Sequence, residues 1–425
     1  MREGKNIKMR TDKCILSRAD TSNMRKILEF IKYGLVSIFL TPIYLLSHLF
    51  PRDKKIWVFE CWFREDFKDN SKYLFLYASE NLKPKIRPVF LSKNKKLIKT
   101  LTKNGMEAHY SYSIKGIWSK IRCKYAFADV SFFDTYLLGG ATKVQLWHGS
   151  PLKKIEYDAR LSVSRIPAFV RRIAKFIAPW TFMRPEHITA PSDSFVGIFA
   201  SAFRINEKNI VVTGYPRTDI FFRNIPFSLI GTDAPIYEKI KKENSNNKII
   251  MYLPTHRDID NVAIEKQFDL DVLNRFLKLN NCFLIIKQHH YVNPNLENDK
   301  IFDRIIFSFS NIDIYPLLSD VDILITDYSS IFFDFLLLDK PIIFFPYDID
   351  KYISKDRELY FDYNEFVPGP IANTFDDLMQ WIEYFIKKPE EFSNKRKDIR
   401  DFSFNYIDGN ASKRICEFIL KHSYP

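Results

Sequence analysis

The chain has 425 residues, of which 46% are hydrophobic and 16% aromatic, and its net charge is +13 at pH 7. That length exceeds what one ordinary hydrophobic core contains, and it predicts two domains. Five scattered cysteines, without the spacing of a zinc site, argue against a disulfide framework and fit a reducing compartment. With only 12 glycines and no internal repeat, the composition also excludes a low-complexity or repeat protein.

The N-terminal segment combines positive charge with a long uncharged stretch. Residues 1–55 hold 12 Lys and Arg against 5 Asp and Glu, which is more than half of the chain's excess charge. Tyr33 to Pro51 then runs for 19 residues without Lys, Arg, Asp or Glu, interrupted by Pro42. This length is at the lower limit for a membrane span and both flanks are basic, so we expect a helix lying in the interface of an anionic membrane. The alternative is a hydrophobic helix packed on the first domain.

From residue 55 onward, apolar strand patterns alternate with helical patterns. Short apolar runs of this kind predict buried parallel strands joined by crossover helices. The first series of predicted strands is Lys55–Glu60, Arg87–Leu91, Tyr125–Val130, Lys143–Trp147, Ile188–Ala190 and Ile210–Thr213. It predicts a Rossmann-like N-terminal domain over residues 55–225, preceded by a basic arm and membrane-associated helix over residues 1–54.

One insertion within the first series is basic and aromatic. Residues 165–184 mix apolar side chains with Arg and Lys in a roughly amphipathic pattern. Such a helix can make a second contact with a membrane, or it can cover the sheet with its apolar face. The sequence favours neither alternative.

A second series of strands follows residues 222–248, whose polar end predicts a linker region. The predicted strands are Ile249–Leu253, Phe283–Lys287, Ile305–Phe307, Ile323–Thr326 and Pro341–Phe345. They predict a second Rossmann-like domain over residues 226–425. Two such domains facing a central cleft form the GT-B architecture of α/β transferases, and ligands in such sheets bind beyond the carboxyl ends of the strands.

The segment of residues 320–339 contains a strand that ends abruptly and leads into a helix. Asp327, Ser329 and Ser330 are residue types that cap helices, and an apolar helical pattern follows at once. Free backbone N–H groups at such a helix start, together with serine hydroxyls, can hold a phosphate. A capped helix without any ligand is the alternative.

Seven short motifs occur in a fixed order along the chain. They are Trp-His-Gly with its flanks at 145–158, Thr-Gly-Tyr-Pro-Arg-Thr-Asp at 213–219, Tyr-Leu-Pro-Thr-His-Arg-Asp at 252–258, Lys-Gln-His at 287–289, Tyr-Asp-Ile-Asp-Lys-Tyr at 347–352, Pro-Gly-Pro at 368–370 and Asp-Gly-Asn-Ala-Ser at 408–412. In this order they resemble the CDP-glycerol glycerophosphotransferase family, the primases and polymerases of teichoic acids and related capsular polymers. The resemblance runs from about Phe59 to about Arg414 and includes Asp-Asn-Ser-Lys at 69–72.

The resemblance implies two catalytic histidines. His148 matches the Trp-His-Gly motif as a general base or its close partner, a role that suits an imidazole because its ordinary pKa lies near working pH. Judged without the family, a histidine near a strand end more often satisfies a buried hydrogen bond. His289 matches the second family histidine and would donate to a phosphate oxygen or protonate the departing phosphate. The family usually has proline next, where this chain has His290, so either histidine of the pair can enter the site.

The resemblance also implies a donor site for the phosphates and nucleotide. The residues predicted to form it are Arg217, Thr255, Arg257, Asp327, Ser329 and Ser330. Arg257 could fork onto the diphosphate, with a structural ion pair as the alternative. Arg217 could do the same or only tie the two domains together. Asp327 is a poor phosphate contact, so we expect it to cap the helix or to orient a base.

Two further charged motifs have predicted roles. Lys153 and Lys154 are predicted to meet an anionic acceptor, with a solvated turn as the alternative. Asp348 and Asp350 form an Asp-x-Asp pair, which we interpret as structural or ribose-contacting because the family is not known for metal use. No metal site and no cofactor are therefore expected.

The predicted reaction is a polyol-phosphate transfer of the EC 2.7.8 type. A hydroxyl of a lipid-linked or oligosaccharide acceptor attacks the β-phosphorus of a CDP-polyol, most simply CDP-glycerol, and CMP leaves. The predicted location is the cytoplasmic face of the cell membrane, as a peripheral or monotopic protein. The alternatives are a nucleotide-sugar glycosyltransferase with the GT-B fold and, more remotely, a basic membrane-associated nucleic-acid-binding protein, for which no recognition motif is found.

Overall fold

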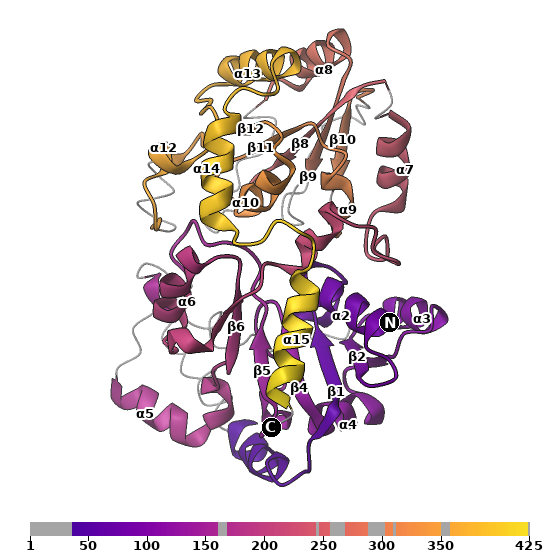
Figure 1. The fold of residues 1–425 in the computed structure, drawn as a ribbon, viewed down its shortest axis with the longest axis vertical. Helices are drawn as coiled ribbons and strands as arrows, with labels where there is room; N and C mark the ends of the chain where they lie inside the picture. Colours follow the sequence, from indigo (N-terminus) through magenta and orange to yellow (C-terminus); the bar gives the residue numbers. More distant parts are fainter. Residues whose placement is uncertain are drawn as a thin grey trace, which may run out of the picture.

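Two parallel β-sheets, one above the other in Figure 1, form the framework of this α/β protein. The computed structural model describes residues 36–159, 168–243, 246–255, 268–287, 302–308, 312–349 and 358–423. The sheets have seven and five strands, and every strand pairing within them is parallel. The predicted α/β fold with two parallel sheets is confirmed.

The seven-stranded sheet belongs to the N-terminal half and has the order β3-β2-β1-β4-β5-β6-β7. Its strands are β1 (Asp53–Glu60), β2 (Arg87–Ser92), β3 (Ala108–Tyr110), β4 (Cys123–Ala128), β5 (Thr142–Gln145), β6 (His187–Ala190) and β7 (Ile210–Val212). The helices of this half are α2 (Asp69–Asn81), α3 (Lys95–Lys103), α4 (Ile114–Arg122), α5 (Ala168–Ile177) and α6 (Val196–Phe203). Trp57 and Phe59 of β1 enter one apolar cluster and Ile56 and Val58 another, so both faces of this sheet are covered.

The five-stranded sheet of the C-terminal half has the order β10-β9-β8-β11-β12. Its strands are β8 (Lys248–Leu253), β9 (Cys282–Lys287), β10 (Ile305–Ser308), β11 (Ile323–Thr326) and β12 (Ile342–Phe344). The helices of this half are α7 (Ala234–Glu243), α8 (Leu270–Leu279), α9 (Tyr315–Leu318), α10 (Ile331–Phe335), α12 (Tyr363–Phe366), α13 (Phe375–Lys387) and α14 (Ser393–Ser403). Ile250 and Tyr252 of β8 face one cluster while Ile249 and Met251 face the other, as expected for a strand buried on both sides.

The predicted strands agree with the observed ones, with two differences elsewhere. The strand β3 was not predicted, because three residues with one histidine give no apolar run. The predicted linker, residues 222–248, contains the ten-residue helix α7. Basic residues in its last turn complement the helix dipole there. Polarity alone does not distinguish such a lysine-rich helix end from a linker.

The last helix, α15 (Ala411–Ser423), returns to the N-terminal half and packs against α2 (Figure 1). The carboxylate of Asp219 accepts hydrogen bonds from the backbone N–H groups of Ala411 and Ser412, at 2.9 and 3.0 Å. These bonds satisfy the first donors of α15, as a capping side chain would. The predicted domain boundary at residues 225/226 stays a prediction. The helix α15 belongs to the predicted C-terminal domain by sequence, but it packs on the N-terminal half.

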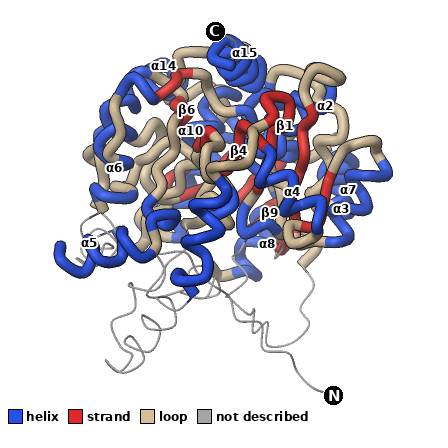
Figure 2. The backbone as a smooth tube through the Cα atoms, turned by 90° about the horizontal axis from the view of Figure 1, so that it is seen from below, coloured by secondary structure: helices blue, strands red, loops and turns tan. Residues whose placement is uncertain are grey.

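The helix of residues 36–47 packs through a polar side and exposes an apolar one. Ser37 and Ser47 are buried, and Thr41 Oγ1 donates to the Ile177 carbonyl of α5 at 2.6 Å. Figure 2 shows this helix and α5 on the side turned toward the viewer. We call the exposed apolar side chains there the lower face: Ile38, Phe39, Leu45, Leu46, Leu49, Ile173 and Phe176. Among the described helices, none combines the length and apolar character needed to cross a bilayer.

Candidate active site

His148 lies in the loop that leaves the carboxyl end of β5, and its side chain is partly exposed. Its Nδ1 lies 3.1 Å from the main-chain oxygen of Asp129, the residue that follows β4. Because a carbonyl oxygen only accepts hydrogen bonds, Nδ1 carries the proton and Nε2 is the acceptor nitrogen. The ring centroid lies 4.1 Å from that of Trp147 and 5.1 Å from that of Trp62. These contacts hold an imidazole whose Nε2 can take a proton.

Gly149 brings the loop of His148 against the C-terminal half. Its φ is +144°, a backbone conformation that L side chains rarely adopt. A Cβ atom here would collide with Oγ of Ser330 and would lie 3.2 Å from Nη2 of Arg217. The backbone after β5 therefore touches the serine that follows β11. Two segments that the sequence singled out, around His148 and Ser330, meet at the junction of the two halves.

Ser329 and Ser330 lie between β11 and α10 and are partly exposed. Ser330 is the N-cap residue of α10, yet its side chain makes no capping hydrogen bond. The helix is five residues long and continues as a single 3₁₀ turn, Leu336–Leu338. A short helix has a weak dipole, so a phosphate here would depend mainly on hydroxyl and backbone donors.

Asp327 connects the ends of two adjacent strands. Its buried carboxylate accepts from the backbone N–H of Thr255, which follows β8, at 2.9 and 3.1 Å. It also accepts from the backbone N–H of Tyr328 at 2.6 Å. Asp327 therefore fixes the loop of Thr255 beside the serines, and its expected roles in capping the helix or orienting a base stay predictions.

Arg217 is buried between two carboxylates of different halves. Its Nη1 lies 2.7 Å from Asp69 Oδ1, at the start of α2, and its Nη2 lies 2.6 Å from Asp334 Oδ2, in α10. Burial alone would raise the pKa of Asp69. The charges of Arg217 and then of His148 outweigh burial and hold this pKa below its ordinary value. Burial raises the pKa of Asp334 despite the neighbouring guanidinium. Of the two predicted roles for Arg217, this geometry matches the tie between the halves.

The Asp-Asn-Ser-Lys segment at residues 69–72 contacts both the His148 loop and the other half. Asn70 Nδ2 donates to the Trp147 carbonyl at 2.8 Å and so holds the backbone before His148. Lys72 pairs with Asp313 of the other half at 2.7 Å, and both side chains are buried. The sequence identified this segment only by family resemblance. The signal that it offered was four polar residues opening a helix in a chain otherwise rich in apolar residues.

Lys287, the last residue of β9, is a further candidate that sequence reasoning missed. Burial, followed by the nearby charge of Lys68, lowers the pKa of Lys287 to about 8. Lys68 belongs to the N-terminal half, so two cations from different halves face the same junction. The charges of Asp313, Asp66 and Asp69 offset part of this repulsion. The signal was present in the Lys-Gln-His motif, where only the histidine received a role.

Lys153 and Lys154 join the His148 loop to the C-terminal half. Lys154 donates its backbone N–H to the Glu358 carbonyl at 2.8 Å, and its Nζ lies 3.4 Å from a Glu358 carboxylate oxygen. Lys153 forms an antiparallel bridge with Leu359. These contacts show more than a solvated turn, and the predicted contact with an anionic acceptor stays a prediction.

Several predicted site residues lie outside the described part of the chain. They are Arg257, His289, His290 and Asp350. Of the Asp-x-Asp pair, Asp348 is described, and it accepts a hydrogen bond from the Tyr328 hydroxyl at 3.2 Å. In the described ranges, no cluster of three or more His, Cys, Asp or Glu could hold a metal ion.

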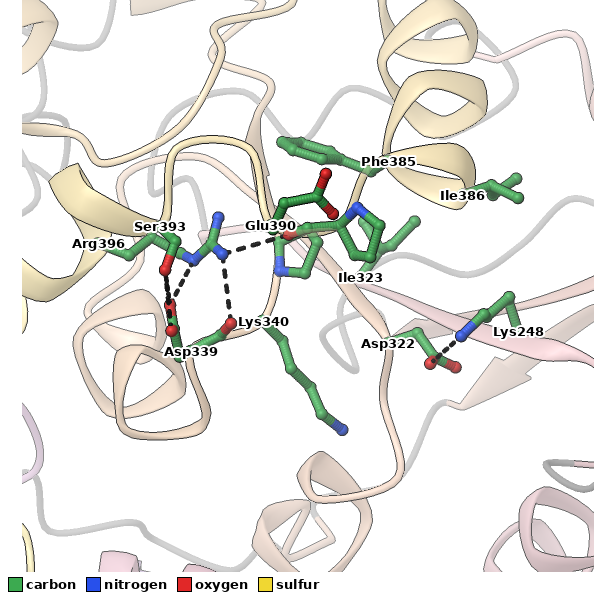
Figure 3. Close-up of a pocket in the computed structure, with 12 residues that line it drawn as sticks. Lys248, Asp322, Ile323, Asp339, Lys340, Phe385, Ile386, Glu390, Ser393 and Arg396 are labelled. Atoms are coloured by element: carbon green, nitrogen blue, oxygen red, sulfur yellow. Dashed lines mark hydrogen bonds and ion pairs between the residues drawn. The ribbon is translucent and has the colours of Figure 1, made fainter.

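A cavity of about 290 Å³ lies at the amino ends of β8, β11 and β12 (Figure 3), whereas His148 follows the carboxyl end of β5. Four of the charged side chains in its wall form two ion pairs: Lys248 with Asp322 at 3.0 Å, and Arg396 with Asp339 at 3.0 Å. Ligands in parallel sheets bind at the carboxyl ends of the strands. This cavity is therefore not the predicted donor site.

Comparison with known proteins identifies the family. Residues 43–421 match the sequence model of CDP-glycerol:poly(glycerophosphate) glycerophosphotransferase. The teichoic acid poly(glycerol phosphate) polymerase of Bacillus spizizenii is 29% identical over 413 residues, covering 93% of this chain and 99% of that protein. The teichoic acid glycerol-phosphate transferase of Staphylococcus aureus is 28% identical over 401 residues, covering 90% of this chain and 96% of that protein. The chain spans half, 50%, of the Staphylococcus epidermidis polymerase, at 28% identity over 380 residues and 86% of this chain.

A solved structure has the same fold. The wall teichoic acid polymerase TagF, in a crystal soaked with CDPG, superposes with a TM-score of 0.72 at 25% identity, covering 94% of this chain and 97% of that chain. The match extends over both sheets and supports a GT-B-type arrangement. The chain therefore belongs to the CDP-glycerol:poly(glycerophosphate) glycerophosphotransferase family, and it is an enzyme of teichoic acid synthesis that transfers polyol phosphate from a CDP-polyol.

Proposed function

We propose that this enzyme transfers glycerol phosphate from CDP-glycerol to a hydroxyl of a lipid-linked or oligosaccharide acceptor and releases CMP. The observation that carries the proposal is the contact of the Gly149 backbone with Ser330, which sets the general-base candidate beside the donor-binding candidates. The relative TagF, studied with CDPG, supports the choice of donor. Membership of this family argues against the nucleotide-sugar glycosyltransferase and the nucleic-acid-binding protein as alternatives.

The residues divide the proposed reaction between the two halves. Nε2 of His148 removes the proton of the acceptor hydroxyl while that oxygen attacks the β-phosphorus. The new O–P bond forms as the P–O bond to CMP breaks, and the electron pair leaves with CMP. Ser329 and Ser330 donate hydrogen bonds to the donor phosphates. Thr255, held by Asp327, lies in the adjoining loop.

Four further assignments complete the proposal. Arg257 is proposed to neutralise the diphosphate, and His289 to protonate the departing phosphate. Lys153 and Lys154 are proposed to meet the anionic acceptor. No metal is invoked, since positioning, cationic side chains and hydrogen-bond donors can supply the charge stabilisation that phosphoryl transfer needs.

The purified enzyme is expected to release CMP from CDP-glycerol faster than from CDP-ribitol, and only when an acceptor is present. Ribitol is the second donor to test because a ribitol-phosphate polymerase of Bacillus spizizenii is 35% identical over 230 residues, 52% of this chain. The measurement is CMP formation by chromatography with each donor, alone and with acceptor. Faster turnover of CDP-ribitol would reassign the donor. Sugar incorporation from a UDP- or GDP-sugar, without polyol phosphate in the product, would contradict the proposed reaction.

We also propose that the lower face attaches the enzyme to the cytoplasmic side of the membrane, as a peripheral or monotopic protein. Phe39, Leu49 and Phe176 are 74%, 77% and 86% exposed, which is unusual for neighbouring large apolar residues. Arg172 and Lys175 of α5 are exposed beside Phe176 and can meet anionic headgroups. Apolar burial and basic attraction together are the usual basis of interfacial binding.

Replacing Phe39 and Leu49 by glutamate is expected to weaken binding to anionic vesicles at least tenfold. Full burial of each side chain would contribute about 1.5–3 kcal/mol, and the new charges repel anionic lipid. Sedimentation with vesicles of phosphatidylglycerol measures the change. The matched control is Leu279→Glu, since Leu279 is 84% exposed on α8 at the opposite end of the molecule. Equal loss of binding in the control would mean that the lower face is not the attachment surface.

A further inference from the structure

The ion bridge formed by Asp69, Arg217 and Asp334 joins one buried cation to carboxylates of both halves. The side chains of Arg217, Asp69 and Asp334 are 3%, 10% and 0% exposed. Tyr315 also donates its hydroxyl to Asp334, at 2.6 Å. Buried ion pairs are a weak source of stability, since the cost of removing charges from water offsets much of their attraction. The place of this bridge in the site therefore calls for a functional explanation.

The bridge reaches His148 through Asp69. Trp62 Nε1 donates to Asp69 Oδ2 at 3.0 Å, and the Trp62 ring packs edge-on against His148 at 5.1 Å and 70°. His148 and Asp69 are close enough to interact electrostatically, and this interaction stabilises the Asp69 charge. By the same interaction, Asp69 stabilises the protonated imidazole, which makes His148 a stronger base.

Other charged groups near His148 act less directly. Asp129 offers its main-chain oxygen to the ring, while Oδ1 accepts from the Ser71 backbone N–H at 2.7 Å. Burial, and then the charge of Asp69, raises the pKa of Asp129 well above its ordinary value, so Asp69 bears the negative charge of this pair. Lys68 lies over the Trp62 ring, 5.4 Å from its centroid, and is paired with Asp66 at 3.0 Å.

We propose that Asp69 and Arg217 are positioning residues whose bridge to Asp334 makes His148 a stronger base when the donor-binding half is docked. With Asp334 in place, Arg217 divides its charge between two carboxylates and leaves part of the Asp69 charge to act on the imidazole. Without Asp334, Arg217 neutralises Asp69 more completely, and the imidazole is a weaker base. Because Asp334 lies four residues after Ser330 in α10, the bridge couples the donor-binding segment to the base. This inference rests on the proposed role of His148 as general base.

The test is the pH dependence of kcat/KM for CMP release, whose acid limb reports protonation of the base. Asp69→Asn removes a negative charge beside His148 and should move the limb to lower pH by about one unit. Asp334→Asn should move it in the same direction by less, since it acts through Arg217. Arg217→Gln removes the cation and should move the limb to higher pH. Arg217→Lys keeps the charge and should leave the limb in place.

The outcomes separate this inference from the proposed function. A limb that stays in place in both asparagine variants, with only the rate lowered, would reduce the bridge to a structural tie and overturn the inference. The asparagine variants nearly conserve shape, so they decide the question even if Arg217→Gln fails to fold. Wild-type enzyme that releases no CMP from a CDP-polyol, or an acid limb that persists in the residual activity of His148→Ala, would instead contradict the proposed function.

Discussion

Replacing His148 by alanine is expected to lower kcat by roughly 10²–10⁴-fold, the usual contribution of a general base. The structure gives the physical reason, because Nδ1 is bound to the Asp129 carbonyl and Nε2 is the nitrogen that accepts a proton. Donor affinity should change little, since the base acts on the acceptor hydroxyl. CMP release at saturating donor measures the rate, and titration calorimetry with CDP-glycerol measures the binding.

The matched control for His148 is His109→Ala. His109 lies in the edge strand β3 and pairs with Glu107 at 2.8 Å, on an element that takes no part in the site. Its loss should leave the rate within a few-fold of wild type. A folded His148→Ala enzyme with nearly normal turnover would show that another group takes the proton, and His289 would then become the leading candidate.

Replacing Gly149 by alanine is expected to lower the rate of turnover about 100-fold or more, although the added group is one methyl. At φ = +144° a side chain strains the backbone, and the new Cβ would also collide with Ser330 Oγ. Such strain costs about 1–3 kcal/mol, and a displacement near 1 Å at a reacting group can cost 10²-fold in rate. Steady-state kinetics and thermal unfolding of the same preparation measure the two effects.

Gly197→Ala provides the control for Gly149, because Gly197 is exposed in α6 and a Cβ there meets nothing within 4 Å. That change should stabilise the helix by about 0.5–1 kcal/mol without affecting turnover. Adding Ser330→Gly to Gly149→Ala removes the colliding group but also a proposed phosphate donor, so the double variant is compared with Ser330→Gly alone. If the collision is the cause, Gly149→Ala should cost less in the Ser330→Gly background than in the wild type. An equal cost in both backgrounds would show that backbone strain alone disables the loop.

The fold was largely predictable because its central strands are continuous apolar runs. Ile323–Thr326 is an example, and its predicted bounds are those of β11. Edge and surface elements lacked this signal: β3 has three residues, and α7 has a lysine-rich end that resembles a linker. Burial on both faces produces a pattern in sequence, whereas partial exposure weakens it.

The candidate site was predictable only in part. His148 and Ser330 were identified from motifs, and the structure brings their segments into contact. The partners of Arg217 could not be identified, since Asp69 and Asp334 are 148 and 117 residues away along the chain. Local patterns report local geometry, and a pairing between remote ion partners depends on how the whole chain folds.

The return of α15 to the N-terminal half has a consequence for protein engineering. Ile415, Cys416 and Ile419 of α15 are each 1% exposed, so this helix supplies apolar surface that the first half needs. A fragment that ends at residue 225 would leave the corresponding patch of α2 in water. Hybrids that exchange donor halves between relatives should therefore carry the cognate residues 411–423 with the N-terminal half, as a second and separate insert. The N-terminal module is therefore discontinuous in sequence, since residues 226–410 separate its two pieces.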